Sequence, residues 1–211
     1  MRSDDIEFCV VIPSVGTRSE LKTCIGALAV QVAKPLTVVL VTPQAAQLDP
    51  SQLQECEVPL VHLQSKVGDQ VEQRRLGVEY LLANYPNAWA VFLDDDIALA
   101  PTALLEVANL IRVSSRNLGA VCMRLDNEGG DKSEVSHRFR ILRQATREPG
   151  SVTRSGRNVA FHGATDGAAV EWVRGGTSVW RGQTLQEFQP PVFPGRYASM
   201  EDVIFSFPIS K

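Results

Sequence analysis

The sequence lacks several features that would assign it to a common class of protein. It has no apolar run that approaches the roughly 18 residues of a membrane-spanning helix. Its 4 cysteines and 3 histidines form neither a CxxC pair nor a mixed cluster, which excludes a zinc-finger type of site. It also lacks an excess of positive charge. Because the formal net charge is -3, nucleic acid is not expected as a partner.

The cysteines and the first seven residues bear on the cellular compartment in which the protein is expected. Cys9 and Cys122 lie inside apolar runs, where buried free thiols are expected, and such thiols favour a reducing environment. Residues 1–7 are too acidic and too polar for a signal peptide. We therefore expect a cytoplasmic protein.

One stretch departs from the overall balance of charge. Between residues 132 and 157, seven Lys and Arg residues stand against two Glu residues. This stretch is either a solvated loop or a surface for phosphate groups, on a lipid-linked acceptor or on membrane headgroups. The second alternative predicts peripheral contact with the inner face of the membrane.

Short apolar runs alternate with helical patterns in the first half of the chain. A length of 211 residues suits a single domain with one core. Helices are expected from about residue 17 to Pro35, from Gly68, and from Pro101. Strands are expected at 8–13, 36–41, 60–63, 88–93 and 119–125. This alternation predicts an α/β fold, with a doubly wound, mostly parallel sheet flanked by helices.

The second half of the chain is less regular. Residues 126–168 are polar, basic and rich in Gly and Ser, whereas helical patterns return near 181–188 and 200–209. We therefore divide the domain into a half at 1–125 and a looser half at 126–211. The looser half is expected to cover the open edge of the sheet.

Three consecutive carboxylates carry the strongest chemical signal. Asp94, Asp95 and Asp96 directly follow a predicted strand, and ligands of doubly wound sheets bind beyond the carboxyl ends of strands. Extended backbone would send Asp94 and Asp96 to one side and Asp95 to the other. Adjacent carboxylates repel each other, and a divalent ion such as Mg²⁺ or Mn²⁺ would offset that repulsion. The alternative is a polar turn in which Asp96 caps the next helix.

Three weaker signals have ordinary structural alternatives. Glu201 and Asp202 begin a predicted helix, where acidic residues are favoured by the helix dipole alone. Arg74 could reach a diphosphate or simply be a surface arginine. Gly175 and Gly176 either let the backbone approach a ligand closely or form a plain turn.

The order of these segments resembles the family 2 glycosyltransferases, which are inverting enzymes with the GT-A fold. The resemblance covers nearly the whole chain. It rests on residues 10–14 with Arg18, on Gln-Arg-Arg-Leu-Gly at 73–77, on the DxD element at 92–96, and on Met-Glu-Asp-Val at 200–203. Residues 149–156 and 170–176 are similar to a branch that acts on bacterial surface polysaccharides.

The resemblance implies a role for each matching residue. It assigns the nucleotide sugar to the first half, the acceptor to Trp172, Gly175, Gly176 and Glu201, and the catalytic base to Asp202. Asp96, with Asp94, would hold Mg²⁺ or Mn²⁺ between the two phosphates. The donor would be a nucleotide-diphosphate sugar and the acceptor a saccharide or a lipid-linked saccharide. The nucleotide-sugar residues are Pro13, Ser14, Val15, Arg18, Arg74, Asp94 and Asp95.

Departures from the family pattern define the alternatives. Thr42-Pro43-Gln44 follows the second strand, where the family usually places an aspartate that reads the base. Nine residues follow Asp202 and none is histidine, so we expect either a chain truncated at its C-terminus or a degenerate copy. A GT-A-like binding protein without catalysis is the main rival. A haloacid-dehalogenase-type phosphatase is a weaker one, because its second acidic pair and lysine are not in place.

Overall fold

The fold is built on a six-stranded mixed sheet. In this computed structural model the described residues are 6–53, 56–114, 118–125, 148–154, 156–189 and 200–211. The strand order is β3-β2-β1-β4-β6-β5. Strands β1 to β4 run parallel, and β6 runs antiparallel to both β4 and β5. The strands are β1 Phe8–Pro13, β2 Thr37–Pro43, β3 Leu60–Ser65, β4 Trp89–Leu93, β5 Ala120–Cys122 and β6 Thr177–Arg181.

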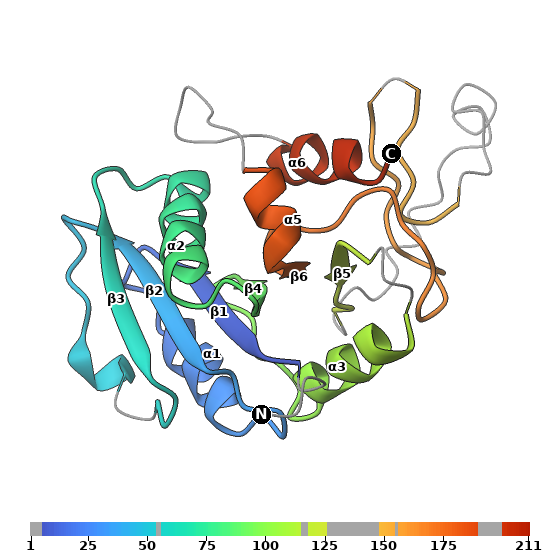
Figure 1. Ribbon diagram of the computed structural model, residues 1–211. Coiled ribbons are helices and arrows are strands. Elements are labelled where there is room, and N and C mark those ends of the chain that lie inside the picture. The colour runs from blue at the N-terminus through green and yellow to red at the C-terminus, as the bar shows by residue number, and fades with distance from the viewer. Residues whose placement is uncertain (1–5, 54–55, 115–117, 126–147, 155, 190–199) are drawn as a thin grey trace.

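Helices cover both faces of this sheet, as Figure 1 shows. Helices α1 and α3 pack on one face, where alternate strand residues such as Val10 and Ile12 point. Helices α2, α5 and α6 lie over the other face, which receives Val11 and Val39. The helices are α1 Glu20–Ala29, the 3-10 turn Pro50–Leu53, α2 Gln70–Asn84, α3 Ala103–Val113, α5 Gly182–Glu187 and α6 Glu201–Ile209.

This architecture confirms the predicted fold class: an α/β domain with a mostly parallel, mixed sheet. The continuous burial of β1, β2 and β4 explains their unbroken apolar runs, because both faces of a central parallel strand are covered. The division at residues 125 and 126 stays a prediction. No helix among the described residues has the length and apolarity to cross a bilayer.

Two local predictions were wrong, and the surface alternative for Arg74 is also excluded. Helix α1 ends at Ala29 rather than at Pro35, and Val32 beyond it is 63% exposed. Strand β6 was missed, although it lies inside the sheet between β4 and β5. Helix α2 buries Gln73 and Arg74 against the sheet edge, whereas Val71 is only half-buried. Tertiary contacts of polar side chains outweigh apolar periodicity on this helix.

Gly77 sets the distance between α2 and the sheet. A Cβ atom at this position would lie 2.3 Å from Cγ1 of Val11 on β1, closer than real carbon atoms approach. The missing side chain therefore lets α2 pack directly on the strand, and this brings Arg74 of the same helix to the sheet edge.

Candidate functional site

The candidate site lies at the point where the strand order of the sheet reverses, between β1 and β4. Strand β1 pairs with β2 on one side and with β4 on the other, and all three are parallel. The segments that follow β1 and β4 therefore leave the same edge of the sheet side by side, at the point where the strand order turns back from β2 and β3 to β4. In doubly wound sheets the crevice at such a point is the usual place for a ligand.

A buried hydrogen bond joins these two segments. The hydroxyl of Ser14 donates to Oδ2 of Asp95 at 2.5 Å, and the hydroxyl oxygen of Ser14 accepts from the N–H of Gly16 at 2.9 Å. Gly16 adopts a left-handed backbone with φ +79. The turn after β1 is thereby fixed against the acidic turn after β4. Pro13 and Ser14 are buried in it, and Val15 is 49% exposed.

Arg18, whose side chain is half-exposed, pairs with two carboxylates of the acidic turn. Its Nη1 lies 3.3 Å from Oδ1 of Asp95 and 2.9 Å from Oδ2 of Asp96. The predicted alternation, with Asp95 pointing away from its neighbours, was therefore wrong. Strand β4 ends at Leu93, and the N–H of Ile97 donates to the carbonyl of Asp94, so these residues form a turn.

The carboxyl of Asp95 is the buried member of the triplet. Burial raises its pKa above the usual 3.8, whereas the bond from Ser14 and the charge of Arg18 act in the opposite direction. Asp96 is half-exposed and caps no helix, because α3 begins only at Ala103. The helix-cap alternative for Asp96 is thereby removed.

Asp94 turns towards the second half of the chain. Its Oδ1 accepts from Nη2 of Arg74 at 2.8 Å and from the side-chain amide of Gln70 at 2.6 Å. The other terminal nitrogen of Arg74, Nη1, lies 3.1 Å from Oε1 of Glu201. One buried arginine on α2 therefore bridges the turn after β4 and the first turn of α6.

The paired glycines make room for this ion cluster. A Cβ at Gly175 would lie 2.7 Å from Nη1 of Arg74, and a Cβ at Gly176 would lie 2.0 Å from Oδ2 of Asp94. The carbonyl of Gly176 also accepts from the N–H of Asp94 at 3.0 Å. The glycines thus admit side chains of the protein, in addition to any ligand.

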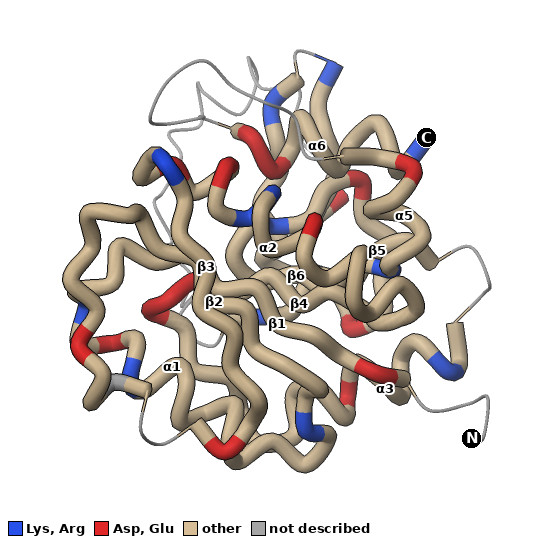
Figure 2. Tube along the Cα trace, turned by 60° about the vertical axis from the view of Figure 1, so that its left-hand side comes forward, with Lys and Arg blue, Asp and Glu red and all other residues tan. Residues whose placement is uncertain are grey.

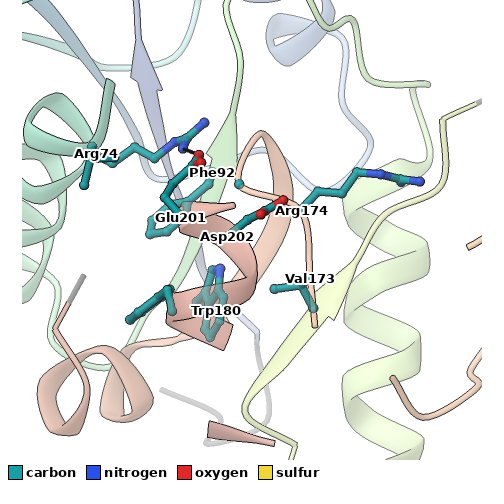
Figure 3. Close-up of a pocket in the computed structure, with 10 residues that line it drawn as sticks. Arg74, Phe92, Val173, Arg174, Trp180, Glu201 and Asp202 are labelled. Atoms are coloured by element: carbon teal, nitrogen blue, oxygen red, sulfur yellow. Dashed lines mark hydrogen bonds and ion pairs between the residues drawn. The ribbon is translucent and has the colours of Figure 1, made fainter. Parts of the chain in front are cut away.

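A small pocket opens beside the arginine, and Figure 3 shows its walls. Glu201 points towards Arg74, and Asp202 lies next to it on α6. The side chain of Arg174 extends away from Arg74. The wall is mainly apolar. The lining residues are Val71, Arg74, Phe92, Val173, Arg174, Gly175, Trp180, Glu201, Asp202 and Phe205.

Asp202 places a half-buried carboxyl at the rim of a mainly apolar pocket. Burial raises its pKa above the usual 3.8, and the negative charge of Glu201 acts in the same direction. The N–H of Val203 and the charge of Arg74 lower it. Met200, which precedes α6, has a left-handed backbone with φ 64, a conformation that costs free energy for a non-glycine residue. This residue turns the chain so that α6 starts at the pocket.

Sequence reasoning missed the aromatic part of the pocket. Trp180 packs against Phe205, with ring centroids 4.8 Å apart and the ring planes tilted by 42°, and both line the cavity. Trp180 lies on the strand that was not predicted. Trp172 does not line this pocket. It is buried against Phe161, and its indole N–H donates to the carbonyl of Val159.

The acidic turn fits a divalent ion that brings part of its coordination shell with it. Among the described residues, no three His, Cys, Asp or Glu side chains form a complete set of ligands. Mg²⁺ and Mn²⁺ commonly take one or two protein carboxylates and complete their shell with water and phosphate oxygens. The half-exposed Asp96 suits this partial role, whereas the Asp94 carboxylate is paired with Arg74 and Gln70 and would have to turn towards the ion.

Charged residues elsewhere are mixed. In Figure 2, positions of Lys and Arg are interspersed with positions of Asp and Glu over the traced residues. Of the basic stretch, residues 132–147 and 155 lie outside the described residues, and Arg154 and Arg157 are exposed.

Comparison with known proteins identifies the fold. No protein-family profile matches the sequence, and no curated protein matches it significantly. The structure is similar to GT-A-type glycosyltransferases. Residues 1–349 of S. aureus TarS bound to UDP match with TM-score 0.63 and 15% identity, over 97% of this chain and 55% of that one. The same TarS region bound to UDP-GlcNAc gives TM-score 0.60 and 15% identity, over 95% and 52%.

A third structure is glucosyl-3-phosphoglycerate synthase from Mycobacterium tuberculosis in complex with Mn²⁺, UDP-Glc and phosphoglyceric acid. It matches with TM-score 0.55 and 12% identity, over 97% of this chain and 63% of that one. The chain thus spans little more than half the length of the TarS region. These similarities confirm the GT-A-like fold that the sequence motifs predicted.

Proposed function

We propose that this chain carries the active site of a glycosyltransferase that transfers a sugar from a nucleotide-diphosphate sugar to a hydroxyl acceptor, with inversion. One observation carries the proposal. In a GT-A-like fold, Arg74 links Asp94 of the acidic turn after β4 to Glu201 of α6, the residue before Asp202. Donor and acceptor groups would then meet at a single sheet edge.

The donor would occupy the crevice between the turns after β1 and β4. Pro13, Ser14 and Val15 would contact the nucleoside, with Asp94 and Asp95 near the ribose. Arg18, already beside the acidic turn, would face the diphosphate, because guanidinium groups bind phosphate oxygens in pairs. Arg74, which the sequence also suggested for this role, is paired with Asp94 and Glu201. Since TarS and the mycobacterial synthase are complexed with UDP or UDP-sugars, a uridine nucleotide is the first donor to test.

Asp96, together with Asp94, would hold Mg²⁺ or Mn²⁺ against the two phosphates. A bound divalent ion would stabilise the negative charge of the departing nucleoside diphosphate. The complex of the mycobacterial synthase contains Mn²⁺, which supports this choice of metal for the fold.

Asp202 would act as the general base. A carboxylate at the rim of a mainly apolar pocket can accept the proton of an acceptor hydroxyl, and a raised pKa makes it the stronger base. The oxygen freed in this way would attack the anomeric carbon opposite the leaving group. A single displacement inverts that carbon, through a transition state with oxocarbenium character.

The acceptor would be a saccharide or a lipid-linked saccharide that lies against Glu201, Gly175 and Gly176. The basic stretch at 132–157 would contact phosphate groups of such an acceptor or of a membrane surface. Sedimentation of the chain with vesicles, with and without anionic lipid, tests the membrane alternative. The chain should sediment only with the anionic vesicles. Sedimentation with both kinds of vesicle, or with neither, would contradict membrane contact.

Release of nucleoside diphosphate from a nucleotide sugar tests the proposed reaction. Purified chain, Mn²⁺ and UDP-Glc or UDP-GlcNAc should yield UDP, and mixed saccharide acceptors should accelerate the release. Binding of UDP without any release would instead indicate a GT-A-like binding protein.

A further inference from the structure

We propose that Arg74 is a positioning residue that locks the helix of Glu201 and Asp202 onto the acidic turn after β4. The donor and acceptor halves of the site would then form one rigid unit. This inference rests on the proposed function only for its catalytic meaning. The structural part can be tested without any activity.

The contacts of Arg74 reach segments that are far apart in the chain. Asp94 is 20 positions and Glu201 127 positions away from it. The arginine side chain is 7% exposed, whereas the side chains of Asp94 and Glu201 are 32% and 24% exposed, so the two ion pairs are partly shielded from water. A buried cation that loses one carboxylate is left partly uncompensated, which is far more costly than the loss of a surface pair.

The guanidinium group of Arg74 is closely packed. Its Nε is buried and has no hydrogen-bond partner among the described residues. Its terminal nitrogens and Cζ lie against Gly175, where an added Cβ would come within 3.2 Å of all three atoms. Nη1 and Nη2 are therefore held in the one orientation that meets both carboxylates. A lysine at this position could place its single charge on only one of them.

Arg74 contacts the N-terminal end of α6, and other residues contact the helix further along. Along α6, the Ser206 hydroxyl accepts from the N–H of Val173 at 3.1 Å, and Phe205 packs against Trp180. These contacts hold the middle of α6. The Arg74–Glu201 pair holds its first turn, where Asp202 stands.

The same pair affects the proton affinity of Asp202. The charge of Glu201 raises the pKa of Asp202, and the charge of Arg74 lowers it. The charged groups around the Asp202 carboxyl are Glu201 on its own helix, Arg74 on α2, and Arg174, which also lines the pocket. In the Arg74–Glu201 pair, the two charges therefore act on the pKa of Asp202 in opposite directions.

Amide hydrogen exchange of residues 201–209 tests the lock directly. Arg74→Gln should speed exchange in α6 by roughly tenfold to a hundredfold, the equivalent of one lost charged hydrogen bond. Arg75→Gln is the matched control, because within the described part of the chain Arg75 pairs only with Glu72 and Glu79 of its own helix. It should leave α6 unchanged.

Gly175→Ala tests the geometry with every charge retained. The new Cβ would meet Nη1 of Arg74 at 2.7 Å, and the end of this long side chain can move away. We expect a folded variant in which exchange of α6 is faster than in the parent. If Arg74→Gln does not fold, Gly175→Ala and Glu201→Gln provide the comparison. Exchange of α6 at the parent rate in the folded variants would overturn the proposal.

The pH profile of transfer provides the catalytic readout. Since Asp202 must be ionised to act as base, the rate should rise with pH through its pKa. Glu201→Gln should shift this rise to lower pH, and Arg74→Gln should shift it to higher pH. Shifts in the same direction would contradict the proposed balance. If the parent chain releases no nucleotide, the proposed function fails, while the exchange measurements still decide the role of Arg74.

Discussion

Ser14 and Asp95, 81 positions apart in the chain, share a buried hydrogen bond of 2.5 Å. The bond fastens the turn after β1 to the turn after β4, and the crevice between these turns is where a GT-A-like sheet is expected to bind its nucleotide. Asp95 is 5% exposed. Asp95 therefore supports the structure of the proposed donor site.

Asp95→Asn should change how stability depends on pH. Because the pKa of Asp95 is raised in the folded chain, the folded state binds its proton more tightly than the unfolded state. This contribution is present below the usual 3.8 and is lost as pH rises through the folded pKa. Asn cannot ionise and its amide oxygen can still accept from Ser14. Urea unfolding measures the free energy of unfolding of the variant and of the parent at both pH values. The difference, variant minus parent, should be more positive at neutral pH than at acidic pH.

Asp49→Asn is a control of opposite sign. Asp49 is exposed, and hydrogen bonds from Ser51 lower its pKa, so its contribution is lost as pH falls. That variant should therefore lose stability relative to the parent at neutral pH. A shift in the same direction for both variants would refute the pKa argument for Asp95.

UDP should bind the chain measurably only when Mg²⁺ or Mn²⁺ is present, because otherwise its phosphates face the carboxylates of the acidic turn. Calorimetry of UDP in Mn²⁺ and in EDTA gives this comparison. Asp96→Asn should weaken binding in Mn²⁺ by at least about tenfold, the scale of one lost charged contact. Asp166→Asn, at an exposed aspartate beside Arg124, should bind like the parent. Equal affinity in EDTA and Mn²⁺ would remove the metal from the account.

Gly77→Ala should destabilise the fold by about 1–3 kcal/mol, the usual cost of overpacking. The new methyl group would overlap Cγ1 of Val11 on β1, so helix α2 would have to move. In a Val11→Ala background the same change should cost less, because the obstructing atom is gone. Thermal or urea unfolding of the four proteins measures this coupling. Equal costs in both backgrounds would show that Gly77 does not set the helix position.

Much of the fold was predictable because the buried parallel strands and the acidic turn have local signatures. Strands β1, β2 and β4 are continuous apolar runs, and Asp94 to Asp96 follow β4 directly. Strand β6 escaped prediction because its five residues carry no such run and its partners β4 and β5 are distant in sequence.

The arrangement of the site side chains could not be derived from spacing. Alternation stops where β4 ends, so Asp94 and Asp95 turn to different arginines. Arg74 looked like a surface residue of a helix, and only the close packing of α2 at Gly77 makes it buried. Trp180 enters the pocket because an unpredicted strand carries it.

The most direct test of the account is the rate of UDP release from UDP-Glc or UDP-GlcNAc by the parent chain and by Asp202→Asn, in Mn²⁺ with mixed saccharide acceptors. The amide keeps the shape of the carboxylate but cannot take a proton. The account predicts a loss of about 10²–10⁴-fold in rate, with calorimetric affinity for UDP unchanged. Retention of more than about a tenth of the parent rate would contradict it and would place the base elsewhere.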